Sequence, residues 1–276
     1  MEFEGLSLGE VYVISTCLRE IHPSGRQRIV SFSGMPNEIY FLILVLAVIQ
    51  SLFGVGILLF GTPILMLLGY QYQEVLLYLL PASAALSWSQ VWDMRSYKLD
   101  GGYRKLFFMI CLPCLMLGMY LTKIYDLKIQ IKIAITIMLF LAFVLRTFEP
   151  LRNRLQTFMQ NYLKSALASM GLIHGLANMG GSILTPLVSS LYTDKNKVLA
   201  GVSFDYAFMA TFQLSVLILM QGYKFLPLYL IGSAIALSVR YLIGKKVFAF
   251  TKEVYYQRLI NGFILANAII LFLTLS

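Results

Sequence analysis

Two stretches rich in glycine and proline interrupt long apolar runs of this sequence, and their residue types suit the binding of an anion. The first runs from Gln50 to Pro63 and the second from His174 to Pro186. Glycine permits unusual backbone dihedrals, and proline removes a hydrogen-bond donor and ends or kinks a helix. A helix that restarts after such a break presents unpaired N–H groups and the positive end of its dipole, which bind anions without a buried cation.

The residues that we expect to bind a substrate all lie in these two stretches. They are Gln50, Gly54, Gly56, Pro63, His174, Gly175, Asn178, Gly180, Gly181, Thr185 and Pro186. Gln50 and His174 precede the two breaks at similar places, which favours a shared polar layer. Close packing of helices through small residues is the alternative explanation for one break taken alone. The presence of two similar breaks in one chain favours a functional site.

Two ionisable side chains within apolar segments, Asp205 and His174, are candidates for proton coupling. A carboxylate in a membrane segment is costly and often functional, and histidine titrates near neutral pH. The alternatives are that Asp205 is solvated at the interface near Lys195, and that His174 is a hydrogen-bonded interior residue. Arg240 is expected to extend to the membrane interface, with a counter-charge for the substrate as the alternative.

No arrangement of side chains in the sequence matches a catalytic, metal-binding or cofactor-binding motif. Cys111 and Cys114 form a C-x-x-C pair, but they lie in an apolar segment without a second cysteine pair or a nearby histidine. His22 and His174 are the only histidines, so a metal site lacks a ligand set. We therefore expect no enzyme activity, no catalytic residue, no metal and no cofactor. The scattered basic residues indicate no binding of nucleic acid.

The elements that position these residues are expected to be helices in a membrane. Of the 276 residues, 59% are hydrophobic and only 13% are charged, whereas soluble domains average about 25% charged residues. A water-soluble fold cannot bury so much apolar surface, so lipid must be the solvent for much of the chain. The formal net charge of +9 fits either basic cytoplasmic loops or a field that attracts anions.

Charged residues mark the ends of the apolar segments. A spanning helix needs about 20 apolar residues, and this length leads to eight predicted spans. They cover residues 39–60, 73–93, 104–122, 128–147, 163–190, 197–221, 225–244 and 257–275. The first and fifth spans belong to charge-free windows that are too long for one simple helix, and these windows contain the two breaks. Lysine and arginine are nearly balanced between the two sides, so the orientation stays open.

Similar features recur at nearly constant distances along the chain, which indicates an internal repeat. Pro63 and Pro186 are 123 positions apart, and the pairs Tyr103-Arg104 and Tyr223-Lys224 are 120 positions apart. Internal repeats of this kind are common in transporters. The predicted fold is therefore an all-α integral membrane protein with about eight transmembrane helices in two four-helix repeats, each beginning with a broken helix.

The repeat divides the chain into four expected parts. They are an N-terminal extension (1–36), a first transmembrane repeat (37–147), a basic linker (148–162) and a second transmembrane repeat (163–276). Two interpretations of the extension stay open, because Met35 directly precedes the first long apolar run. In the first interpretation, Met35 is the true start of the protein. In the second, the residues before Met35 form a loosely held or disordered segment.

The two breaks and the duplicated four-helix unit resemble the TauE/SafE sulfite exporter family, also called the TSUP family of membrane transporters. The resemblance covers residues 37–276 and depends on glycine, proline and their spacing. The family pattern often has three consecutive glycines. Here Gly54 and Gly56 precede apolar residues in the first half, and Gly180 and Gly181 follow Asn178 in the second. The second break is therefore the more polar one.

The resemblance implies a secondary transporter of small anions such as sulfite, organosulfonates or related sulfur-containing anions. The expected location is the cell (inner) membrane, which the chain crosses several times, and the expected partners are the small anion and the lipid bilayer. No ATP-binding motif is present in the sequence, so we expect an ion gradient, of protons in the first instance, to drive transport. A non-transporting membrane assembly or sensor subunit is the alternative, and the oligomeric state stays open.

Overall fold

The computed structural model describes most of the chain in two compact units, Met1–Glu38 and Ile39–Ser276. The described residues are 19–20, 28–29, 37–125, 148–192, 194–219, 222 and 225–250. In the first unit, strands β1 (Arg19–Glu20) and β2 (Arg28–Ile29) pair antiparallel, with Arg19 opposite Ile29. The predicted spans 128–147 and 257–275 lie outside the described residues.

The second unit is helical, and its first half opens with a helix that stops and restarts. The elements are α1 (Asn37–Phe53), α2 (Ile57–Leu67), α3 (Tyr72–Asp93), α4 (Gly101–Leu106), the π-helical segment η1 (Phe107–Cys111) and α5 (Leu112–Tyr125). The second half follows the same order after a short polar helix. Its elements are α7 (Glu149–Asn161), α8 (Leu163–Ala177), α9 (Gly181–Leu191), α10 (Lys195–Leu219), α11 (Tyr229–Val239), η2 (Arg240–Gly244) and α12 (Lys245–Phe250).

The helix breaks lie where glycine and proline predicted them. The helix ends at Phe53 and at Ala177, and after three intervening residues it restarts as an eleven-residue helix in both halves. The span predicted at 225–244 is different, because its helix begins at Tyr229 and passes through a π-helical turn before it continues to Phe250. The segment predicted as a basic linker contains α7.

Three helical stretches in the described part of the chain are long and apolar enough to cross a membrane. They are Tyr72–Asp93, Gly101–Ile124 and Lys195–Leu219. Large apolar side chains, among them Phe41, Leu117 and Leu242, are exposed on the outer faces of the helices. Such exposed apolar surface is costly in water and suits contact with lipid tails.

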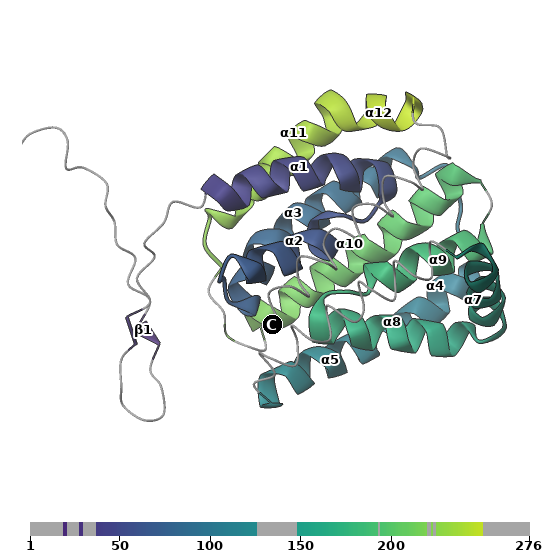
Figure 1. Ribbon diagram of the computed structural model, residues 1–276, viewed down its shortest axis with the longest axis horizontal. Helices are drawn as coiled ribbons and strands as arrows, with labels where there is room; N and C mark the ends of the chain where they lie inside the picture. The colour runs from purple at the N-terminus through teal and green to yellow at the C-terminus, as the bar shows by residue number, and fades with distance from the viewer. Residues whose placement is uncertain are drawn as a thin grey trace, which may run out of the picture. The chain divides into compact units, whose positions relative to one another are not determined.

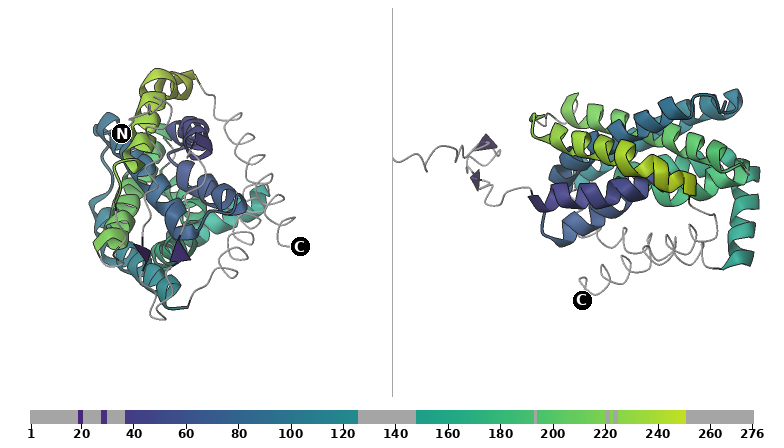
Figure 2. Two further views of the ribbon diagram at one scale, coloured as in Figure 1. Left: turned by 90° about the vertical axis from the view of Figure 1, so that its left-hand side faces the viewer. Right: turned by 90° about the horizontal axis from the view of Figure 1, so that it is seen from above.

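Helices α3 and α10 form the centre of the helical unit and connect its two halves. They pack against each other along their length, and α11 packs on α3 while α9 packs on α10. Figure 1 shows α10 crossing the middle of the unit, and Figure 2 shows the helices from two further sides. On the other side of this centre, α5 packs against α8. The short helices that follow the breaks, α2 and α9, also touch each other.

Candidate functional site

The two helix breaks use a backbone conformation that their residues accommodate at low cost. Gly54 follows α1 with φ of +72°, and Asn178 follows α8 with φ of +60°. Glycine adopts this left-handed region freely, and asparagine tolerates it better than other residues with a Cβ atom. Each break therefore lets the chain leave one helix and start a second one inside the protein core, where Gly56 and Gly180 precede the new helix.

The first break is closed by the side chain of Gln50. Its Oε1 accepts a hydrogen bond of 3.0 Å from the amide of Ile57, the first residue of α2. Its Nε2 donates to the hydroxyls of Ser83 and Ser87 on α3, at 3.1 and 3.0 Å. The first turn of a helix has N–H groups without partners in the helix. At α2 one of these groups is satisfied by the protein itself.

The end of α1 is also satisfied by side chains from other helices. Gln90 on α3 donates its amide to the carbonyl oxygens of Gln50 and Ser51, at 3.0 and 3.2 Å. Arg240 donates to the Ser51 carbonyl at 3.0 Å. The hydroxyl of Ser203 on α10 donates to the side-chain oxygen of Gln90 at 3.2 Å. The first break is thus the centre of a hydrogen-bond network that includes residues of both halves.

The second break has a different environment, with several buried polar groups and few hydrogen bonds. His174, Tyr206 and Gln213 are fully buried. Within the described residues, neither ring nitrogen of His174, nor the Tyr206 hydroxyl, nor the Gln213 carboxamide has a hydrogen-bond partner of normal geometry. The Gln213 amide does lie beside the His174 ring, and the His174 and Tyr206 rings are 5.8 Å apart between centroids.

Two consecutive glycines let the start of α9 approach these polar side chains. A Cβ atom placed on Gly180 would lie 2.6 Å from Cβ and 3.0 Å from Nδ1 of His174. A Cβ atom placed on Gly181 would overlap the Tyr206 ring, with its hydroxyl nearest. Glycine is therefore required at both positions for steric reasons. The amides of the first turn of α9, the His174 ring and the Tyr206 hydroxyl meet in one place.

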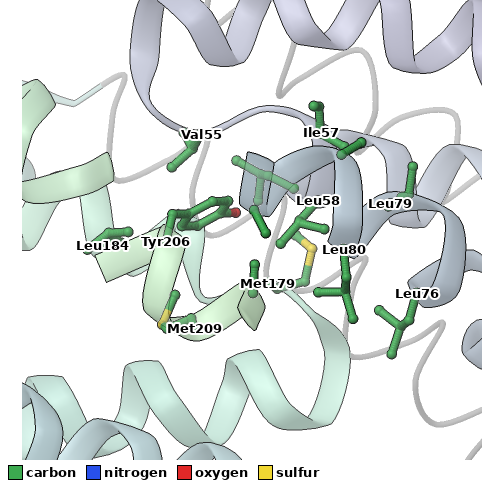
Figure 3. Packing of buried hydrophobic residues seen from close by; sticks show 14 of the residues in the cluster. Val55, Ile57, Leu58, Leu76, Leu79, Leu80, Met179, Leu184, Tyr206 and Met209 are labelled. Carbon is green, nitrogen blue, oxygen red and sulfur yellow. The ribbon is translucent and has the colours of Figure 1, made fainter. Parts of the chain in front are cut away.

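A direct hydrogen bond connects the two breaks. The side-chain Nδ2 of Asn178 donates to the hydroxyl of Thr62 on α2 at 2.8 Å. Figure 3 shows Tyr206 of α10 lying between Val55 of the first break and Met179 of the second. No hydrogen bond between Gln50 and His174 is found in the part of the chain that the structure describes. The hydrogen bond that links the two breaks is instead the one between Thr62 and Asn178.

The remaining predicted site residues shape the helices around the breaks. Pro63 lies inside α2 and Pro186 inside α9. The Thr185 hydroxyl donates to the carbonyl of Gly181 at 3.4 Å, within its own helix. Gly175 faces α5, where an added Cβ would lie 2.9 Å from the amide nitrogen of Met119. Gly175 therefore serves the close contact between α8 and α5.

The carboxylate of Asp205 is buried beside a tyrosine hydroxyl. Tyr103 of α4 donates its hydroxyl to Oδ2 of Asp205, and both side chains are almost fully buried. The other oxygen, Oδ1, has no hydrogen-bond partner among the described residues. Solvation of Asp205 near Lys195, one of the two alternatives from the sequence, is therefore wrong. Asp205 directly precedes Tyr206 on α10, so it lies one residue from the polar groups at the second break.

The expected extension of Arg240 to the membrane interface is also wrong. Its side chain is only 1% exposed, and its Nη2 forms an ion pair with Oδ2 of Asp93 at 3.1 Å. Lys245 binds the other oxygen of the same carboxylate at 2.8 Å. A buried guanidinium needs a counter-charge and hydrogen-bond acceptors. Asp93 and the Ser51 carbonyl supply both, so Arg240 links η2 to α3 and α1.

Sequence reasoning did not identify Tyr206, Gln213 and Gln90 as members of these networks. A signal for them was present in the predicted repeat. Gln90 and Gln213 are 123 positions apart, the same distance that separates Pro63 from Pro186. Extending the proline alignment through the next helix would have paired these two glutamines.

Comparison with known proteins gives one family. The model of the sulfite exporter TauE/SafE family matches residues 39–271, which include both breaks and all the helices after residue 38. Neither a curated protein nor a solved structure gives a significant match.

Proposed function

We propose that this chain, which belongs to the sulfite exporter TauE/SafE family of membrane transport proteins, is a secondary transporter of a small anion. The proposed substrates are sulfite, organosulfonates or related sulfur-containing anions, and the proposed location is the cell (inner) membrane. The proposed architecture is two four-helix repeats, 37–147 and 163–276, after an extension (1–36) and around the linker 148–162.

One observation carries this proposal. In each half a helix breaks within the core, and the restarted helices α2 and α9 touch each other. Irregular backbone at membrane depth is tolerated only where it is buried in protein or lines a cavity. Broken helices whose N-termini point at an anionic substrate are a recurrent way to build a transporter site between two repeats. The predicted substrate-binding residues, from Gln50 to Pro63 and from His174 to Pro186, lie at these two breaks.

The proposed energy source is an ion gradient, with Asp205 and His174 as the groups that carry protons. Asp205 is buried with one oxygen bound by Tyr103 and the other without a partner among the described residues. His174 lies at the amide end of α9. A carboxylate and an imidazole in a membrane protein core are the groups most often used for proton relay.

Flux measurements in proteoliposomes test the proposal. Purified protein is reconstituted, and the flux of sulfite, methanesulfonate and taurine is measured with and without a pH gradient. We expect flux of at least one of these anions that exceeds the flux through empty liposomes and responds to the gradient. Absence of flux for every small anion under both conditions would contradict transport. It would favour the non-transporting assembly or sensor subunit instead.

A further inference from the structure

The polar residues at the two breaks occupy corresponding positions in the two halves. Gln50 corresponds to His174 at a distance of 124 positions, and Ser83 corresponds to Tyr206 at 123. Gln90 corresponds to Gln213, also at 123 positions. The members come from equivalent helices, α1 and α8 for the first pair and α3 and α10 for the others. Each half thus places three polar side chains around the start of its restarted helix.

In the first half, the three side chains satisfy one another and the backbone. Gln50 donates to the hydroxyl of Ser83, and Gln90 donates to the carbonyl of Gln50. The decisive contact is the 3.0 Å hydrogen bond from the amide of Ile57 to Oε1 of Gln50. An oxygen atom with partial negative charge therefore already lies at the positive end of α2. This half is closed to a further anion.

In the second half, the side chains of His174, Tyr206 and Gln213 make no hydrogen bond of normal geometry within the described residues, although the Gln213 amide lies beside the His174 ring. The residue that corresponds to Ile57 is Gly181, 124 positions later, and its amide makes no hydrogen bond within the described residues. An imidazole at position 174 does not supply the oxygen that the carboxamide of Gln50 supplies. His174, Tyr206 and Gln213 together contribute five of the ten buried side-chain nitrogen and oxygen atoms without a partner in the described residues.

We propose that the second break alone forms the oxyanion site, and that a substrate oxygen binds the Gly181 amide in the way Oε1 of Gln50 binds Ile57. Tyr206, Gln213 and His174 then donate to the remaining oxygens. This inference rests on the proposed transport function and assigns Tyr206 and Gln213 as specificity-determining residues. Buried polar groups that lack partners destabilise the protein, so a ligand that supplies acceptors offsets this cost on binding.

The donors in this site define the chemical class of the ligand. An amide, a hydroxyl, a carboxamide and a neutral imidazole hold oxygen atoms by directional hydrogen bonds, without a fixed cation at the site. The close contacts of Gly180 and Gly181 with His174 and Tyr206 bring these donors next to the first turn of α9. The site therefore suits the sulfite, sulfonate or sulfate type of head group, in which several oxygens surround one atom.

Single-atom changes test the assignment of Tyr206. We expect Tyr206→Phe to raise the KM for anion flux about tenfold, the effect of one lost hydrogen bond to an anion, with kcat less affected. Tyr72→Phe is the matched control, since the Tyr72 hydroxyl is also buried without a partner among the described residues but lies elsewhere, on α3. Its KM should equal that of the unaltered protein. An unchanged KM for Tyr206→Phe in a protein that transports would overturn the inference and leave the proposed function intact.

The substitution His174→Gln tests the asymmetry between the halves. A carboxamide at this position copies the first half and supplies an oxygen to the Gly181 amide. We expect a higher melting temperature in detergent together with loss of anion binding and flux. Ser83→Ala, a change near the first break at the position that corresponds to Tyr206, should lower the melting temperature and leave KM unchanged. A Ser83→Ala variant with raised KM, or a His174→Gln variant with normal flux, would overturn the inference. Absence of flux in the unaltered protein would overturn both proposals.

Discussion

The Asn178 side chain donates a 2.8 Å hydrogen bond to the Thr62 hydroxyl and thereby joins the two helix breaks across the proposed repeats. Asn178 also caps α8, because its own amide donates to the carbonyl of His174 at 2.8 Å and its backbone is left-handed. One residue thus shapes the second break and ties it to α2. Any movement that separates α2 from α9 must break this bond.

Removing this hydrogen bond from either side should change the rate of transport, because α2 and α9 can then separate more easily. We expect Thr62→Val, which keeps the shape of the side chain, to alter transport rate while the protein stays folded. Asn178→Gly keeps the left-handed backbone and removes the same bond. The double variant should be no worse than the more affected single variant. Additive losses in flux would show that the two side chains act independently, against the structure.

The close contacts at the second break predict that one added methyl group strongly reduces anion flux. Gly180→Ala would place Cβ 2.6 Å from Cβ of His174, and Gly181→Ala would overlap the Tyr206 ring. We expect both variants to lose most anion flux, measured in proteoliposomes at equal protein density. Gly101→Ala is the control, because within the described residues a Cβ placed there meets no atom within 4 Å beyond its chain neighbours and its own helix backbone. Full activity of both alanine variants would contradict the close approach of α9 to His174 and Tyr206.

The buried carboxylate of Asp205 predicts a specific defect in coupling. We expect Asp205→Asn to bind the anion and to carry it down its own gradient, without the response to a pH gradient that the unaltered protein has. An amide keeps the shape and the acceptor for Tyr103 but does not exchange a proton near neutral pH. Asp194→Asn is the control, since Asp194 is exposed and accepts hydrogen bonds from the amides of Asn196 and Lys197. A persistent pH response in Asp205→Asn would remove Asp205 from the coupling mechanism.

The ion pair of Arg240 with Asp93 predicts a large effect on stability. Removing one partner of a buried pair costs about 3–5 kcal/mol, so Arg240→Met should strongly lower the unfolding free energy. Asp93→Asn in the same chain should restore part of this loss, because the carboxylate loses its charge and its remaining partner, Lys245, is 40% exposed. Lys245→Met tests the more exposed partner of Asp93, whose side chain is 40% exposed, and its effect should be small. Equal losses for Arg240→Met and Lys245→Met, measured by denaturation in detergent, would argue against a dominant buried pair.

The breaks were predictable because glycine and proline act locally. Gly54 and Asn178 adopt left-handed conformations that the sequence alone makes plausible, and the long charge-free windows around them demanded an interruption. The π-helical turns were not predictable. One extra residue in a turn is a small change in geometry that depends on packing, and neither Phe107–Cys111 nor Arg240–Gly244 has a distinctive composition.

The partners of buried polar residues were the harder part of the prediction. Arg240 lies in an apolar segment, and its counter-ion, Asp93, is 147 positions earlier in the chain. Local sequence holds no information about that distance, so extension to the interface was the natural expectation. The same holds for Asp205 and Tyr103, which are 102 positions apart. Only the helix packing brings these pairs together.

The close contact between α5 and α8 limits how these two helices can move relative to each other. A Cβ on Gly171 would overlap the backbone at Cys111, and one on Gly118 would lie 2.9 Å from the amide nitrogen of Leu176. Small residues thus bring the two backbones into direct contact over more than one turn, which is tight packing for membrane helices. These helices belong to different proposed repeats, yet they can hardly slide past each other. We expect α5 and α8 to move together as one rigid body. The boundary between the moving parts of the protein then differs from the boundary between the two proposed repeats.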